Sequence, residues 1–350
     1  MWLITLRDLQ WRRRRFAIAI GATALVFAMA LVIAGIAASF RAEAARTVAA
    51  VGADAWVTSE DVTGPFTTFA SLPIEHEQTL EMDSAVRTAD PLIVLRQTYL
   101  TGGGGAKDVT LIGHRPGGLG TPPVARGRPA ASQREIAVDA SAKFDLGETF
   151  VVGTTSFTVV GVTEGLHFFA GLPAAYVVLP DAQELAFGGT EFVTAFVTEG
   201  VPTGLIPSLK VSTNENARKD LMRPLLSAIQ TIDLCQLLLW AVAAAIIGSV
   251  VYLSALERVR DFAVLKATGA STRSLYAGLA LQAILVSLVA GALAVGIAHA
   301  IGPTFPLAVE IPTGSYALLP GVALIVGILA SIAGLRRTAT VDPALAFGGP

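Results

Sequence analysis

One stretch of the sequence calls for a test of nucleotide chemistry. The run Gly102–Asp108 (GGGGAKD) superficially resembles a phosphate-binding loop. However, Lys107 follows alanine instead of glycine, and it precedes aspartate instead of the serine or threonine that would hold Mg²⁺. The run therefore lacks the residues that cradle a nucleotide. We interpret it as a glycine-rich hairpin loop.

Metal-binding and nucleophilic motifs are also missing. Glu75-His76-Glu77 lacks the second histidine of a zinc-binding helix. The other histidines, His114, His167 and His299, are scattered without ligand spacing. Neither G-x-S-x-G nor S-x-x-K occurs, and the single Cys235 excludes an intrachain disulfide. We read the carboxylates of residues 75–83 as a solvated face, and we predict a chain that is not an enzyme and binds no metal or other cofactor.

The segment 257–273, which opens ERVRDFAVLKATGAS, is the strongest candidate for a functional site. It is an amphipathic stretch of about four helical turns between two uncharged apolar runs, so it must lie at one membrane surface. Gly269 supplies a helix stop before the next apolar run. Its apolar residues can rest on other protein while its charged residues face outward: Phe262, Val264 and Leu265 on one side, and Glu257, Arg258, Arg260, Asp261 and Lys266 on the other.

Composition places much of the chain in lipid. The sequence is 53% hydrophobic and 15% charged, whereas soluble domains carry about 25% charged residues. Positive charge collects in three short segments that flank apolar runs, namely residues 1–15, 257–273 and 336–350. By the positive-inside rule all three are cytoplasmic, which predicts a multi-pass protein of the plasma membrane with both termini in the cytoplasm.

Four apolar runs predict four transmembrane helices, at residues 16–40, 234–256, 275–298 and 317–335. The first run is uncharged and, at about 1.5 Å per residue, longer than the roughly 30 Å hydrocarbon core. A cleaved signal peptide is the alternative, but its apolar region is normally only about 7–15 residues long. Residues 1–15 predict an amphipathic interfacial helix with membrane anchors at Trp2, Trp11, Arg12, Arg13, Arg14 and Arg15.

Residues 41–230 predict an extracytoplasmic α+β domain between spans one and two. Short strands are expected around Trp56 and Val57, at Ala85–Leu100 with a break at Pro91, and in several alternating segments up to Leu179. Helices are expected at Ala140–Leu146, Asp181–Phe187 and Thr213–Gln230, the last divided by Pro224.

The segment 257–273 resembles the cytoplasmic coupling segment of FtsX/MacB-like ABC transporter permeases. The matching residues are Glu257, Arg258, Phe262, Ala263, Leu265, Lys266, Ala267, Gly269 and Ala270, and the departures are Asp261 and Thr268. The middle region shares an ordered set with the extracytoplasmic domain of MacB-like permeases: Gly127-Arg128-Pro129, Glu135–Asp139, Leu146-Gly147-Glu148 and Phe157–Val162. The C-terminus carries the similar basic, Asp-Pro, Ala signature, Arg336-Arg337, Asp342-Pro343 and Ala346.

The resemblance implies a non-catalytic permease subunit in a bacterial inner membrane that works by mechanotransmission. Two copies of an ABC ATP-binding subunit would bind ATP and Mg²⁺, and two permease copies would form a homodimer in the bilayer. Charged residues of segment 257–273 would orient the ATPase, while Phe262 and Leu265 would anchor it. The permease helices could meet at Gly248, Gly278, Gly291, Gly296 and Gly327. No nucleic-acid partner is expected.

Two functions remain open under this resemblance. The first is export or extraction of a lipophilic or peptide substrate, with an adaptor or lipoprotein as an extracytoplasmic partner. The second is signalling without transport, in which the chain activates a cell-wall hydrolase. The predicted outer domain is larger than is usual for FtsX, which favours the first. An amino-acid importer would need buried polar residues in its spans, and only Gln236, Gln282 and His299 come close.

Overall fold

The computed structural model describes residues 13–101, 104–169, 171–204, 207–257, 261, 264, 269, 271–305, 309–311 and 313–338. The chain divides into two compact units, with boundaries at Ser39/Phe40 and Ser227/Ala228. We call Met1–Ser39 together with Ala228–Pro350 the helical unit, and Phe40–Ser227 the α+β unit.

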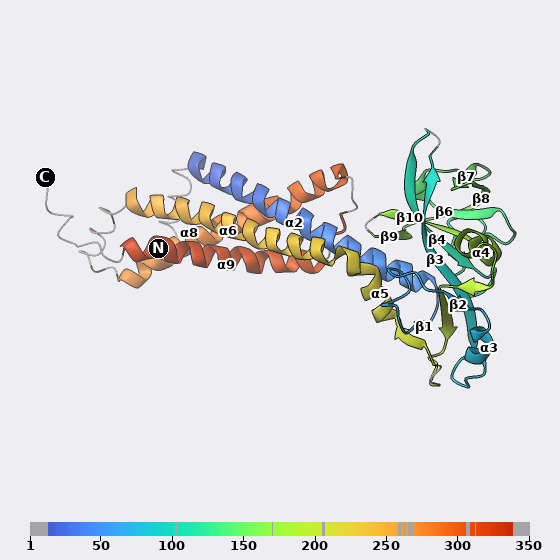
Figure 1. Cartoon of the computed structure of the whole chain (residues 1–350). Helices are drawn as coiled ribbons and strands as arrows, with labels where there is room; N and C mark the ends of the chain where they lie inside the picture. The colour runs from blue at the N-terminus through green and yellow to red at the C-terminus, as the bar shows by residue number, and fades with distance from the viewer. Residues whose placement is uncertain are drawn as a thin grey trace. The chain divides into compact units, whose positions relative to one another are not determined.

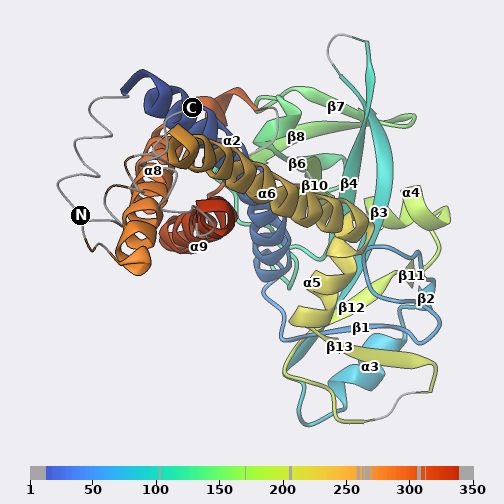
Figure 2. The same cartoon turned by 90° about the vertical axis from the view of Figure 1, so that its left-hand side faces the viewer.

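The helical unit is built from long apolar helices (Figures 1 and 2). They are α2 (Arg13–Ala50), α6 (Leu226–Glu257), α8 (Thr272–Ile301) and α9 (Thr313–Thr338). One shared core includes Phe27 of α2, Val251 of α6, Val286 of α8 and Val326 of α9. Leucines also lie on the outside of α6, where Leu237 and Leu238 are more than half exposed. A helix that is apolar on its outer face as well is suited to lipid.

Three helical stretches within the described residues are long and apolar enough to cross a membrane: Arg13–Ala50, Asn214–Glu257 and Ala277–Thr304. They contain most or all of the predicted spans 16–40, 234–256 and 275–298. A shorter apolar stretch, Thr313–Leu329, overlaps the predicted fourth span. The fourth span therefore stays a prediction.

Helices α8 and α9 approach each other closely at Gly327. A Cβ atom on Gly327 would lie 3.1 Å from the backbone nitrogen and Cα of Ile284, so only hydrogen fits there without a shift. Gly327 thus packs closely against α8 of its own chain. In the same unit, a Cβ atom on Gly35 of α2 would lie 2.7 Å from the side chain of Val309.

The α+β unit is organised by one mixed sheet with the order β13-β1-β12-β3-β4-β10-β6-β8-β5. Strands β7 and β9 pair beside this path, and β2 with β11 forms a separate ribbon. The strands are β1 (Ala55–Ser59), β2 (Leu72–Pro73), β3 (Thr88–Leu100), β4 (Ala106–His114), β5 (Arg126–Gly127), β6 (Glu135–Asp139), β7 (Thr149–Val152), β8 (Thr155–Thr163), β9 (His167–Phe168), β10 (Leu172–Val178), β11 (Phe192–Val193), β12 (Ala195–Glu199) and β13 (Leu209–Thr213).

Both faces of this sheet are buried. One core contains Ile93, Leu111 and Phe196 together with residues of α3 (His76–Glu81) and α4 (Leu179–Phe187). The other contains Trp56, and residues of α5 (Asn214–Met222) and of the end of α2. Alternate residues of β3 enter the two cores, as the two-residue period of a strand requires.

The long strand β3 corrects the expected break at Pro91. Residues Thr88–Leu92 pair with β12, whereas pairing with β4 starts only at Ile93. Pro91 therefore has a neighbouring strand on one side only, and a proline, which has no N–H to donate, is tolerated at such an edge.

Of the three helices expected in the α+β unit, two form and one does not. The helix predicted at Asp181–Phe187 is confirmed as α4, and Pro224 does divide the third, because the 3₁₀ turn Arg223–Leu225 separates α5 from α6. The helix predicted at Ala140–Leu146 is wrong. Only the turn Ala140–Ala142 forms, and it ends at Lys143 in the left-handed conformation (φ +61°).

Replacing Gly327 by valine is expected to destabilise the helical unit, because the new side chain must push α8 and α9 apart. Overpacking of this kind typically costs about 1–3 kcal/mol. Gly321 in the same helix has no atom within 4 Å of its Cβ position, so Gly321→Val is the matched control. Thermal unfolding of the full chain in nanodiscs measures the difference, and equal midpoints for the two variants would contradict the close packing.

Candidate functional site: the junction of the first span with segment 257–273

An ion pair joins the first turn of α2 to the last residue of α6. Nη1 of Arg15 donates to both carboxylate oxygens of Glu257, at 3.0 and 3.1 Å. Nη2 of the same guanidinium donates to the carbonyl oxygen of Val250 at 3.1 Å. A single side chain therefore holds α2 against the end of α6, where segment 257–273 begins.

The two side chains carry opposite charges and come from different helices, α2 and α6. The two side chains are 25% and 46% exposed, so solvent screens the attraction and an exposed pair of this type contributes only about 0.2–1 kcal/mol. Its main effect is to orient the start of segment 257–273.

The backbone contact to Val250 is specific. A serine inside a helix commonly donates its hydroxyl to the carbonyl four residues earlier. For Ser254 that carbonyl belongs to Val250, which accepts from Arg15, and the buried Ser254 hydroxyl has no partner among the described residues. The guanidinium of Arg15 thus contacts α6 at two points, the carbonyl oxygen of Val250 and the carboxylate of Glu257.

The structure describes part of the remaining predicted site. Asp261 is helical and exposed, and Gly269 adopts φ +95° in a turn before α8 begins at Thr272. Arg13 and Arg14 are exposed at the start of α2. The other predicted coupling and anchor residues lie outside the described residues: Arg258, Arg260, Phe262, Leu265, Lys266, Ala267, Trp2, Trp11 and Arg12.

Sequence reasoning assigned Arg15 to the membrane interface and Glu257 to a partner protein, and it missed that the two bind each other. They are 242 positions apart, so no local pattern joins them. The one available signal was topological. The charge rule placed both residues on the same side of the membrane, next to the ends of spans one and two.

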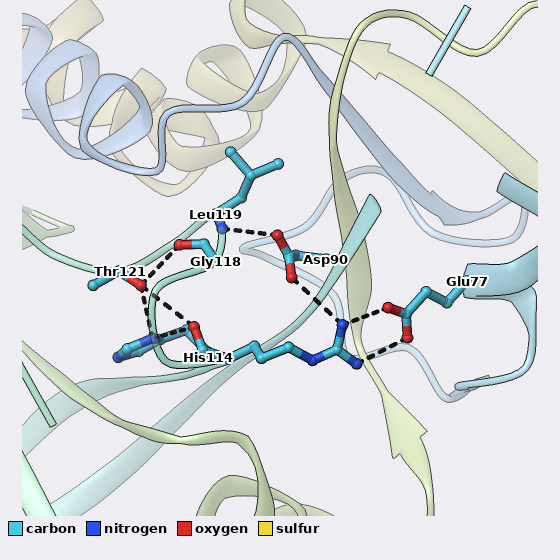
Figure 3. Close-up of polar contacts among 7 residues, drawn as sticks. Glu77, Asp90, His114, Gly118, Leu119 and Thr121 are labelled. Carbon is cyan, nitrogen blue, oxygen red and sulfur yellow. Dashed lines mark hydrogen bonds and ion pairs between the residues drawn. The ribbon is translucent and has the colours of Figure 1, made fainter. Parts of the chain in front are cut away.

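In the α+β unit, the polar contacts of Figure 3 hold a loop. The guanidinium of Arg115 pairs with both carboxylate oxygens of Glu77, at 2.5 and 3.0 Å, and lies 3.6 Å from the carboxylate of Asp90. Asp90 accepts from the backbone N–H of Leu119 at 2.8 Å. Glu77 is only 15% exposed, so the interpretation of residues 75–83 as a solvated face is wrong for this carboxylate.

His114 beside this loop is fully buried. Its Nδ1 lies 3.1 Å from the carbonyl oxygen of Arg115, and burial lowers the pKa of the imidazole. The neutral ring with its proton on Nδ1 fits this contact. The ring packs edge-on to Tyr176, so its role is to fill the core.

A second histidine forms a charged cluster where the end of α2 meets the sheet. Nε2 of His167 lies 2.9 Å from the buried carboxylate of Asp139. The hydrogen bond to Asp139 raises the pKa of His167. Burial would raise the pKa of Asp139, but hydrogen bonds from His167 and Ser141 outweigh it and lower that pKa. Burial raises the pKa of Glu43 on α2.

These contacts do not assemble a reaction centre. Among the described residues no three His, Cys, Asp or Glu side chains gather as a metal site would require. The described residues form long apolar helices and an α+β domain.

Comparison with known proteins identifies the family. Residues 16–223 match the MacB-like periplasmic core domain, and residues 236–343 match the FtsX-like permease C-terminal region. The chain therefore belongs to the FtsX/MacB family of ABC transporter permeases, and it is an integral membrane protein.

Relatives carry the same description over their whole length. Two uncharacterized ABC transporter permeases of Mycobacterium tuberculosis are 41% and 40% identical, each covering 100% of this chain and 100% of the relative. A probable export ATP-binding/permease protein of Pseudomonas fluorescens is 26% identical over 57% of this chain and 34% of that protein.

Two solved structures of extracytoplasmic domains are similar to part of the chain. The periplasmic region of MacB from Actinobacillus actinomycetemcomitans is 12% identical, with a TM-score of 0.33 over 47% of this chain and 90% of that one. The extracellular domain of the transporter YknZ from Gram-positive bacteria is 18% identical, with a TM-score of 0.34 over 46% of this chain and 99% of that one.

Exchanging the charges of the ion pair tests the junction. Arg15→Glu and Glu257→Arg are each expected to disturb the start of segment 257–273, because each places two like charges together. The double exchange restores an opposite pair and should recover part of the loss, about 0.2–1 kcal/mol in a double-mutant cycle. Arg14→Glu, at an exposed neighbour, is the control. Unfolding in nanodiscs gives the cycle, and strict additivity would contradict the pair.

The His167–Asp139 contact predicts a pH dependence. Because the pKa of His167 is raised in the folded state, its charge stabilises the fold below about pH 6.5, the unfolded value, and this contribution is lost as pH rises through the folded pKa. His167→Gln keeps a donor for Asp139 without the charge. The wild type should lose about 1 kcal/mol more than this variant between pH 6 and pH 9, since charge-assisted hydrogen bonds are stronger than neutral ones. Parallel unfolding curves at the two pH values would refute it.

Proposed function

We propose that this chain couples ATP hydrolysis in a separate ATP-binding subunit to motion of its α+β unit outside the membrane, and that the motion serves export or extraction of a lipophilic or peptide substrate. Segment 257–273 is the docking site for the ATPase. The chain works as a homodimer with two ATPase copies in a bacterial inner membrane, with residues 1–15 and 336–350 in the cytoplasm.

The contact between Arg15 and Glu257 is the observation that carries this proposal. It ties the first residue of the docking segment to α2. Helix α2 then runs without interruption to Ala50, and its last turns contribute Ala44 and Val48 to a core of the α+β unit. A displacement of segment 257–273 is therefore passed to a helix whose far end belongs to the domain that moves.

A second route starts from the other end of α6. Helix α6 is preceded by the turn Arg223–Leu225 and by α5. The buried carboxylate of Asp220 on α5 accepts from the backbone N–H groups of Phe66 and Thr67, at 2.9 and 3.2 Å. Because a loop of the α+β unit is held by α5, movement of α6 along its axis would be carried to that loop.

The topology in this proposal includes a fourth span near Thr313–Leu329, which returns the chain to the cytoplasmic side. The basic residues around Arg13 and in segment 257–273 support the cytoplasmic assignment. Cysteine accessibility to a membrane-impermeant reagent at residue 143 and at residue 14 tests the two sides.

Replacing both Phe262 and Leu265 by aspartate is expected to abolish co-purification of the ATP-binding subunit, because the apolar anchor of an interface carries most of its binding energy. The matched control is Phe262→Leu with Leu265→Met, which keeps apolar volume. Tagged chains are purified from native membranes and their partners are identified by mass spectrometry. An ATPase that stays bound to the aspartate variant would refute the docking assignment.

The same purification separates transport from signalling. Recovery of the ATPase with an adaptor or a lipoprotein supports export, and ATPase stimulation by a substrate would extend it. Recovery with a peptidoglycan hydrolase would replace export by activation of that enzyme. Recovery of no ATPase from wild-type membranes would contradict both.

A further inference from the structure

The connection between β8 and β10 lies against the last turns of α2 within the α+β unit. The hydroxyl of Thr47 donates to the backbone carbonyl oxygen of His167 at 2.8 Å, and the carboxylate of Glu43 accepts from the backbone N–H of Gly171 at 3.3 Å. Because positions 43 and 47 are one helical turn apart, they share one face of the helix. We call residues 165–169 and 171 the β9 segment, and this face of α2 holds it.

The histidine of this segment stands between carboxylates from two elements. Nε2 of His167 lies 2.9 Å from the carboxylate of Asp139 at the end of β6. From α2, the carboxylate of Glu43 attracts the protonated ring and the guanidinium of Arg46 opposes it. On β10, burial raises the pKa of Tyr176, so this phenol near Asp139 stays neutral. These are the charged and titratable groups that face His167 and its partner from β6, α2 and β10.

The charges of this cluster balance only when His167 is protonated. While both carboxylates are ionised, the positive charges of His167 and Arg46 then face the negative charges of Asp139 and Glu43. Loss of the proton from His167 leaves the two carboxylates opposed by one guanidinium. Asp139 repels the charge of Glu43, which burial already makes unfavourable. Deprotonation of the ring therefore destabilises Glu43 in its present position.

The contact between Glu43 and Gly171 is the one that this repulsion would break. Asp139 is 1% exposed, and backbone N–H groups of Ser141 and Leu166 hold its carboxylate at 2.9 and 3.1 Å. The Glu43 side chain is less deeply buried, and its bond to Gly171 is longer, at 3.3 Å. Repulsion is relieved when Glu43 turns toward solvent, and that movement removes the acceptor from the Gly171 N–H.

We propose that His167 operates a pH-sensitive clamp, which holds the β9 segment on α2 while the ring is protonated and releases the segment around Gly171 when the ring is neutral. The bond from Thr47 and the buried ring of Phe168 carry no charge, so the release is local. The clamp goes beyond the proposed function and does not rest on it. If α2 transmits motion as proposed above, acid around the α+β unit would tighten the attachment of that helix.

Hydrogen exchange of the full chain in nanodiscs, followed by mass spectrometry at pH 6 and pH 9, tests the clamp. Each rate is divided by that of an unfolded peptide at the same pH, so that only protection is compared. Because the hydrogen bond to Asp139 raises the pKa of His167, the clamp is closed below about pH 6.5, the unfolded value, and opens as pH rises through the folded value. Peptides that contain the β9 segment should lose protection about fivefold at pH 9, the size of one net hydrogen bond.

Two variants separate the clamp from the overall stability of the fold. His167→Gln keeps a donor for Asp139 without the charge, so the β9 segment should show the low protection of pH 9 at both pH values. Glu43→Gln keeps an acceptor for Gly171 without the charge, so the segment should stay protected at both. Glu164→Gln, the same change at an exposed carboxylate beside the segment, is the matched control and should retain the pH dependence of the wild type.

Equal protection of the wild type at the two pH values would overturn the proposal. So would a pH dependence that persists in His167→Gln, because another group would then be the one that titrates. A pH dependence that persists in Glu43→Gln would show that repulsion between the carboxylates does not open the clamp. The measurement needs no ATP-binding subunit, so each of these outcomes would leave the docking of segment 257–273 untouched.

Discussion

The structure depends on one physical constraint: a chain that crosses lipid must satisfy its backbone hydrogen bonds within each segment. Long helices are the outcome, and here α2 and α5–α6 continue beyond the length that the bilayer needs. Each of these two helical stretches contributes residues to the α+β unit as well. Because helices are stiff along their axes, the same constraint that builds the spans also provides the elements through which the proposed motion is passed.

Buried carboxylates follow a common rule in the α+β unit. Asp90, Asp139, Asp181 and Asp220 are all at most 4% exposed, and each accepts a backbone N–H from a loop or turn. Hydrogen bonds from backbone N–H groups to a carboxylate offset the cost of burying its charge. In a soluble enzyme such residues would be inspected as catalysts. Here they attach loops and turns to the sheet, to α4 and to α5.

Local chemistry explains how much could be predicted. Pro224 removes a helix donor and clashes with the preceding turn, so the division between α5 and α6 followed from its type. Gly269 tolerates a positive φ, so the turn before α8 was also predictable. The break expected at Pro91 was wrong because the effect of a proline in a strand depends on whether a second strand pairs at that position. The partner strands come from residues 106–114 and 195–199. Residue spacing within Ala85–Leu100 contains no information about those partners.

By itself, the sequence determined that this protein has apolar spans, an α+β domain and a charged segment between spans two and three, because hydrophobic runs, charge asymmetry and turn residues act over short distances along the chain. Only the tertiary structure decided that Arg15 binds Glu257, that Gly327 packs on α8 and that Asp220 of α5 binds the backbone of Phe66 and Thr67. These contacts join residues from different elements. Their energies depend on distance in space, which the linear order of residues does not record.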